Sequence, residues 1–421
     1  MTSPLLPEIT QLWAKKFAND EAAYASKEFK RLCDIAAEVY CQSGSPFELK
    51  DKNDVAMHAT DMRNALRNIG APWNADLPLP PLAAAEAIDR AYAARICMLT
   101  HLIPLDLADE LPSVRFGPWR IQSFDSKELG NLVGLARLNR FGHTKVLDVK
   151  RLSSFRWAVL EESVPIYSEN RWRHLFRGWN DIGKVRHIRR QFEPAIERGL
   201  FVLSLYPWED HTEADYVTWQ PFQFPWVYTV KHHIFAAPQT APDPDSLTWT
   251  TQFTQEGEDF EAPQINDFNT QELGDLERKL GDVWDRLASL GSPKWDGNDA
   301  FNPLVERFFL RAFGDDDLDQ LLWHVTTVDA AIGMKEQSST KSIKRRVKTL
   351  LGNKASGESF GAYYDIRSGY VHGRQLQDPN LWQRDLAGAR RLARRVAYET
   401  LKLASDNRGW SRADLLQYLD R

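Results

Sequence analysis

Apolar residues recur at three- and four-residue spacing through the first hundred positions, which is the pattern of helices with one buried face. The segment from Tyr24 to Tyr40 carries this pattern most fully. A proline-rich stretch from Pro72 to Pro81 interrupts the pattern, and a second helix is predicted from Leu82 to Leu99. We therefore expect residues 1–110 to form an N-terminal helical region.

The pattern changes after residue 110. Val114 to Ile121 predicts a strand pair, and short apolar runs rich in Val, Trp, Tyr and Phe follow, with proline and glycine between them. These runs span Phe155–Leu160, Leu200–Tyr206, Val217–Phe222 and Trp226–Phe235. We expect residues 111–263 to form a mixed, mostly β domain that senses a signal or holds RNA.

Helical periodicity returns from residue 264 to the end. Asn269 or Thr270 is the expected N-cap of the first helix in this part. The predicted helices are Leu273–Leu290, Pro303–Phe313, Leu318–Met334, Ser342–Leu351, Phe360–His372 and Leu381–Ala404. The sequence thus predicts an all-α bundle over residues 264–421 and an α+β multidomain fold for the whole chain.

Composition narrows the class of protein. The 421 residues suggest two or three domains. No apolar run reaches the roughly 18 residues of a membrane span, and the first residues do not have the pattern of a signal peptide. Three cysteines without a CxxC pair favour neither a zinc site nor a disulfide framework. We expect a reduced, soluble, cytoplasmic protein with no cofactor.

Four short motifs suggest chemistry but favour structural roles. Gly352–Ser359 has the spacing of a phosphate loop, with Glu358 in place of the lysine. Gly357–Gly361 spells a nucleophile elbow around Ser359, but no strand is predicted before it, so a loop that caps the next helix is favoured. His232 and His233 lie on a predicted strand and point to opposite faces. The acidic run at residues 315–319 fits a helix start.

Net charge is −5, from 53 basic and 58 acidic residues, so any nucleic-acid surface must be local. Residues 171–190 hold seven basic residues with interleaved tryptophan and phenylalanine, which suits a phosphate backbone with stackable bases or, equally, a solvated helix face. A second basic group consists of Lys341, Lys344, Arg345, Arg346 and Lys348, for which a charged helix surface is slightly favoured over RNA binding. The candidate RNA-binding residues are Arg171, Arg173, Arg177, Lys184, Arg186, Arg189, Arg190, Lys344, Arg345, Arg346 and Arg374.

The most informative stretch is Asp365–Arg374, DIRSGYVHGR. Its Arg367 can hold a phosphate and its His372 can move a proton near neutral pH. On one helix these two side chains lie about 140° apart, whereas Ser368 and His372 share a face. A dimer with two such helices face to face could bring both sets into one cleft.

In this context the Arg-x4-His pair resembles the motif of the HEPN superfamily, and the phrase DIRSGYVHG resembles its ApeA-like group. The segment Leu321–Gly333 is similar to the family's earlier helix with an acidic residue, here Asp329. The segment Ser342–Leu351 resembles the helix that follows. The resemblance covers about residues 264–421.

The resemblance implies a four-to-six-helix bundle that forms a homodimer through the motif helices. It implies a metal-independent endoribonuclease, of a kind that often serves in anti-phage defence by abortive infection, with a phage-derived trigger as a further partner. Arg367, His372, Asp329 and Ser368 are then the candidate catalytic residues. Two alternatives stay open: a catalytically silent HEPN protein that binds nucleic acid or a partner as a sensor or scaffold, and a hydrolase that uses Ser359.

Overall fold

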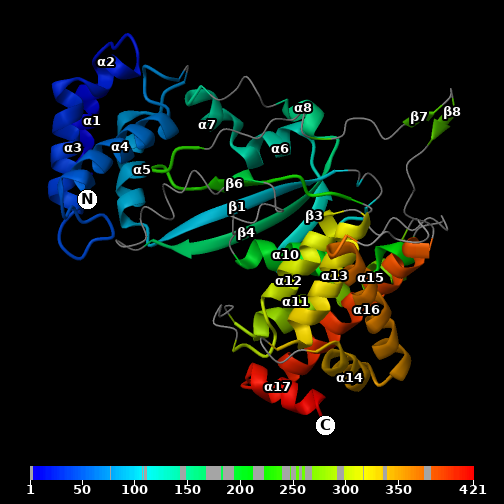
Figure 1. Cartoon of the computed structure of the whole chain (residues 1–421). Helices are drawn as coiled ribbons and strands as arrows, with labels where there is room; N and C mark the ends of the chain where they lie inside the picture. Colours follow the sequence, from blue (N-terminus) through cyan, green and yellow to red (C-terminus); the bar gives the residue numbers. More distant parts are fainter. Residues whose placement is uncertain are drawn as a thin grey trace. The chain divides into compact units, whose positions relative to one another are not determined.

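The chain folds into two compact units in the computed structural model (Figure 1). The first contains Met1–Asp109, Arg120–Val185 and Phe224–Trp249, and the second contains Glu110–Trp119, Arg186–Gln223 and Thr250–Arg421. The structure is α+β, with an antiparallel sheet in the middle of the chain and helices at the C-terminus. It describes residues 3–75, 77–106, 108, 111–142, 148–166, 182–183, 194–211, 222–238, 247, 253–255, 258–260, 268–291, 298–315, 317–334, 339–373 and 381–421.

The described helices of the first unit form two groups in the sequence, one before the strand that begins at Ile96 and one between residues 126 and 152. Ser26 caps the predicted helix by accepting a hydrogen bond from the Phe29 amide, and buried apolar residues line its inner face. The helix α4, with its polar sequence, was not predicted. The helices are α1 (Leu6–Trp13), α2 (Asp20–Tyr24), α3 (Lys27–Tyr40), α4 (Lys52–Ile69), α5 (Pro81–Ala93), α6 (Ser126–Val133), α7 (Leu135–Arg140) and α8 (Val149–Leu152).

The sheet of the first unit is built around β1 (Ile96–Leu105). Its order is β3 (Trp119–Ser123), β4 (Arg156–Pro165), β1, β6 (Val227–Lys231) and β5 (Ile182–Gly183). The prediction that the second helix extends to Leu99 is wrong. The helix α5 ends at Ala93, and Ile96–Leu99 are the first residues of β1. This strand is buried on both faces over most of its length, so its continuous apolar run carries no two-residue alternation that would identify it.

The second unit contains β2, the first strand of the predicted pair, and one wrong prediction. The turn after β2 (Val114–Phe116) holds Gly117 at φ +51°, where a Cβ atom would lie 2.2 Å from the Trp284 ring. Leu200–Tyr206, predicted as a strand, lies largely in α10 (Pro194–Leu205). Its apolar residues are buried on all sides, so the run has no polar face to reveal a helix. Most of Val217–Phe222 lies outside the described residues.

The C-terminal part of the second unit is helical, as predicted. Asn269 caps the first helix in a capping box with Glu272. The elements are η2 (Trp208–His211), β7 (Phe253–Gln255), β8 (Glu258–Phe260), α11 (Thr270–Ser289), α12 (Leu304–Gly314), α13 (Asp317–Ile332), α14 (Thr340–Leu351), α15 (Lys354–Val371), α16 (Leu381–Asp406) and α17 (Arg412–Leu419).

The helix α15 begins six residues earlier than predicted, capped by Asn353 and not by Ser356 or Ser359. Gly357 lies inside it, and a Cβ atom there would come within 2.6 Å of the Lys344 carbonyl oxygen on α14. The two glycines of the Gly-x-Ser-x-Gly spelling therefore permit close packing of α14 and α15. Throughout the described stretch 339–373 no strand precedes Ser359, which excludes a nucleophile elbow.

A buried carboxylate joins η2 to α16. Arg394 donates hydrogen bonds to both oxygens of Glu209, at 2.6 and 2.7 Å, and Arg390 lies 3.5 Å away. Burial alone would raise the pKa of Glu209, but the hydrogen bonds and charge of Arg394 and the charge of Arg390 hold that pKa below its usual value.

We predict that Glu209→Gln lowers the free energy of unfolding by about 3–5 kcal/mol, because two buried guanidinium groups lose their counter-charge. Since the folded-state pKa is depressed, this stabilisation is present above about pH 4 and is lost as the pH falls through the folded pKa. Urea unfolding at pH 7 measures the change. Glu399→Gln, at a half-buried position of α16, is the control, and equal midpoints for the two variants would contradict the assignment.

Candidate functional site

The candidate catalytic residues lie on two helices of the second unit that pack together, α13 and α15. Asp329 is in the last turn of α13, and Arg367 is in the second-last turn of α15. Surrounding atoms desolvate the Asp329 carboxyl and raise its pKa, while the charges of Arg367 and then Arg412 lower it. The structure therefore brings Arg367 within electrostatic reach of Asp329.

Arg367 is half-buried, and its side chain contacts an aromatic ring. Its guanidinium carbon lies 5.6 Å from the centroid of the Tyr364 ring, which supports the side chain through a cation–π contact. Its Nε atom is buried and makes no hydrogen bond with any described residue. An arginine that is held by stacking keeps its fork of N–H groups for a bidentate acceptor such as a phosphate.

His372 follows the last residue of α15 and is exposed. Its backbone N–H donates to the Ser368 carbonyl oxygen at 3.1 Å, and Gly373 follows at φ +69°. Its imidazole makes no hydrogen bond with the described part of the chain. Ser368 is half-buried one turn before it. Chemically, the end of α15 thus offers an exposed imidazole and a half-buried guanidinium whose Nε atom makes no hydrogen bond with the described residues.

The C-terminal end of α13, beside Asp329, is fixed by two arginines that no sequence motif indicated. Arg412 donates to the carbonyl oxygens of Ala330, at 2.8 Å, Ala331 and Gly333, at 2.7 Å. Arg346 donates to the Ile332 carbonyl oxygen at 2.9 Å. Burial lowers the pKa of Arg412 to about 10, with the charge of Arg346 acting in the same direction.

The predicted RNA-binding residues fall into two groups. The first lies outside the described residues: Arg171, Arg173, Arg177, Lys184, Arg186, Arg189, Arg190 and Arg374. The second is on α14, where Lys344 forms an ion pair of 3.8 Å with Glu358. Arg345 is exposed and donates to Asp420 at 2.7 Å. Arg346 is buried, and all its described hydrogen bonds go to Asp420 and the end of α13. Arg346 therefore has a structural role.

His232 and His233 follow the last residue of β6, so the prediction that they lie on the strand is wrong. His232 is exposed and hydrogen-bonds Thr100 at 2.8 Å, whereas His233 is buried beside the Ala91 carbonyl oxygen. Burial lowers the pKa of His233 to about 4. Among the described residues no cluster of His, Cys, Asp or Glu is suited to hold a metal ion, and no helix is long and apolar enough to cross a membrane.

Comparisons with known proteins add nothing to this geometry: no family model, no curated protein and no solved structure matches the chain.

The two neighbouring arginines of α14 should differ sharply when substituted. Hydrogen bonds from Arg346 are the main cause that lowers the pKa of Asp420 to about 2. Arg346→Gln should lower the free energy of unfolding by about 1–2 kcal/mol, and Arg345→Gln by less than about 0.5 kcal/mol. Because the folded pKa is depressed, the contribution is complete above about pH 4 and lost as pH falls through 2. Urea unfolding at pH 7 and pH 2.5 measures both. Equal losses of unfolding free energy in the two variants would contradict the structural role of Arg346 and leave it a candidate for RNA binding.

Proposed function

We propose that this protein is a metal-independent endoribonuclease of HEPN type. The observation that carries the proposal is the end of α15, where the Arg367 Nε atom makes no hydrogen bond with the described residues and His372 is exposed, near the acidic Asp329. A guanidinium, an imidazole and a carboxylate are sufficient in kind for RNA cleavage by the strand's own 2′-hydroxyl.

In this mechanism His372 takes the proton of the ribose 2′-hydroxyl as that oxygen attacks the adjacent phosphorus. The bond to the 5′-oxygen breaks, and a protonated imidazole returns a proton to the leaving oxygen. The products are a cyclic 2′,3′-phosphate and a 5′-hydroxyl. Arg367 stabilises the negative charge on the crowded phosphate, and Asp329 acts as a positioning residue for Arg367.

A second copy of the chain completes the proposed site. Side chains five positions apart on one helix lie about 140° apart, so one α15 does not direct Arg367 and His372 at one phosphate. Beside His372, Tyr370 and Val371 are 39% and 54% exposed. Apolar groups left in solvent at the end of a helix suit contact with the same surface of a partner chain.

The remaining parts of the proposal concern the role in the cell. The basic stretch at residues 171–190 holds RNA, and the domain at residues 111–263 senses a phage-derived trigger. Cutting of RNA in the cytoplasm after infection then serves defence by abortive infection. Such a role fits an enzyme whose active site is assembled from two chains.

Purified wild-type protein should cleave total RNA with EDTA present, and Arg367→Ala and His372→Ala should each reduce the rate at least about 100-fold, the usual contribution of one acid–base or charge-stabilising group. Gel analysis of the RNA fragments measures the cleavage rate, and analysis of the fragment ends tests for the cyclic phosphate.

The matched controls are the exposed His232→Ala and Arg395→Ala, which should cut at the wild-type rate. Equal cleavage by the wild type and all variants would overturn the assignment of His372 as the acid–base residue. Wild-type protein that binds RNA without cutting it, with and without the phage lysate that contains a trigger, would favour the silent scaffold.

Val371→Asp should convert the dimer to a monomer and abolish cleavage, because a charge replaces an apolar contact at the proposed interface. Val55, 56% exposed, is the matched control for Val371, and Val55→Asp should leave both properties unchanged. Sedimentation velocity and the cleavage assay measure the outcome. A dimeric but inactive Val371→Asp, or an active monomer, would contradict the composite site.

A further inference from the structure

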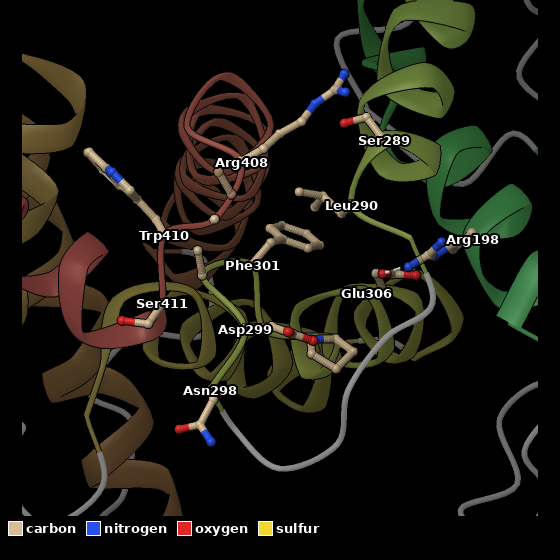
Figure 2. Close-up of a pocket in the computed structure, with 14 residues that line it drawn as sticks. Arg198, Ser289, Leu290, Asn298, Asp299, Phe301, Glu306, Arg408, Trp410 and Ser411 are labelled. Atoms are coloured by element: carbon tan, nitrogen blue, oxygen red, sulfur yellow. Dashed lines mark ion pairs between the residues drawn. The ribbon is translucent and has the colours of Figure 1, made fainter.

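A cavity of about 380 Å³ lies in the second unit, away from the proposed catalytic residues in sequence (Figure 2). Arg198 of α10 and Glu306 of α12 lie together at one side of it, and the Phe301 ring lies between them and the end of α16. Arg408, which is exposed, extends toward Ser289 on another side. The walls thus combine a charged pair, an apolar ring and a separate cation.

The charged pair is buried without being satisfied. The side chains of Arg198 and Glu306 are 13% and 7% exposed, and their nearest charged atoms are 3.8 Å apart, too far for a hydrogen bond. The Arg198 Nε atom is buried and makes no hydrogen bond with any described residue. For the Glu306 carboxyl, the described polar contact is the ion pair of 3.8 Å with Arg198. Buried polar groups are normally hydrogen-bonded, so an unpartnered Arg198 donor beside a carboxyl that lines the same cavity indicates a polar ligand.

We propose that this cavity binds the guanine base of a nucleotide. The Glu306 carboxylate accepts hydrogen bonds from N1–H and N2–H, and the Arg198 guanidinium donates to O6. Phe301 and Leu290 contact the face of the base, and Arg408 provides positive charge for the phosphate. This inference does not rest on the ribonuclease proposal.

Guanine fits this pair better than the other bases do. A carboxylate has two acceptor oxygens, and guanine has two parallel donors, directly beside an acceptor that suits a guanidinium. Adenine offers one such donor group next to a ring nitrogen, which leaves one oxygen of Glu306 without a partner. Uracil places a single N–H between two carbonyl oxygens, one of which would face the carboxylate.

The titration of Glu306 gives the binding a pH dependence. Burial raises the pKa of Glu306 to about 8; Arg198 of α10 opposes this shift, Glu197 of α10 adds to it, and Arg307 of its own helix opposes it. Two donors from guanine favour the ionised carboxylate. Binding of guanine should therefore tighten as the pH rises from 6.5 to 8.

The test is calorimetric titration of the full chain with GMP, AMP and UMP at pH 8. GMP should bind at least about tenfold more tightly than AMP. Glu306→Gln should weaken the binding of GMP by about ten- to a hundredfold, because a charge-assisted hydrogen bond is lost. It should also shift preference toward AMP, because a glutamine amide matches the donor and acceptor of adenine.

Glu197→Gln is the matched control. Glu197 pairs with Arg307 at 3.3 Å on the same two helices but does not line the cavity. Because the Glu197 charge raises the pKa of Glu306, its variant should bind GMP at least as tightly as the wild type does. Arg198→Lys, which keeps the charge but loses the planar fork, should also weaken GMP and replaces Glu306→Gln if that variant does not fold. Equal binding of GMP and AMP, no GMP binding, or equal losses in both glutamine variants would overturn the proposal.

Single-stranded RNA pentamers with one central guanosine or adenosine distinguish the source of the base. If the guanosine pentamer binds at least as tightly as GMP and shows the same loss in Glu306→Gln, the cavity reads a base of an RNA strand. If only GMP binds, the ligand is a free nucleotide. Wild-type cleavage without GMP binding would refute this inference alone, and GMP binding without cleavage would leave the ribonuclease proposal alone refuted.

Discussion

The last carbonyl groups of a helix have no partner within that helix, and at the end of α13 this requirement is met by two arginines. Arg412 takes the carbonyl oxygens of Ala330, Ala331 and Gly333, and Arg346 takes that of Ile332. Both arginines come from elements that meet α13 only in the folded chain. Their charges compensate the helix dipole, and their hydrogen bonds fix the backbone next to Asp329. The position of Asp329 in the proposed site therefore depends on this cap.

Much of the secondary structure could be predicted because it depends on one buried face. The helices α3, α11 and α14 alternate apolar and polar residues with helical spacing, and the capping box at Asn269 marks the start of α11. Prediction failed where burial is complete. α10 and β1 are both continuous apolar runs, and only their neighbours decide which of them is a helix and which is a strand.

The motif of the proposed site could be located from the sequence, but the partners of its residues could not. Arg345 and Arg346 are adjacent and chemically identical, yet one is exposed and the other is buried against Asp420, some 74 positions away. A charge run alone carries no information about such long-range pairs. The Arg198–Glu306 pair was missed for the same reason, since its two residues come from distant helices and belong to no motif.

The geometry of α15 also bears on how such an enzyme would be controlled. Because Arg367 and His372 diverge around the helix axis, the proposed chemistry exists only in the associated form of the chain. Catalytic activity and dimerisation are then one equilibrium, and any ligand that binds the dimer more tightly than the monomer raises the amount of assembled site by its difference in affinity. A trigger therefore need not touch the reacting phosphate. It needs only to favour association of the two α15 helices, whose exposed apolar ends lie directly beside His372.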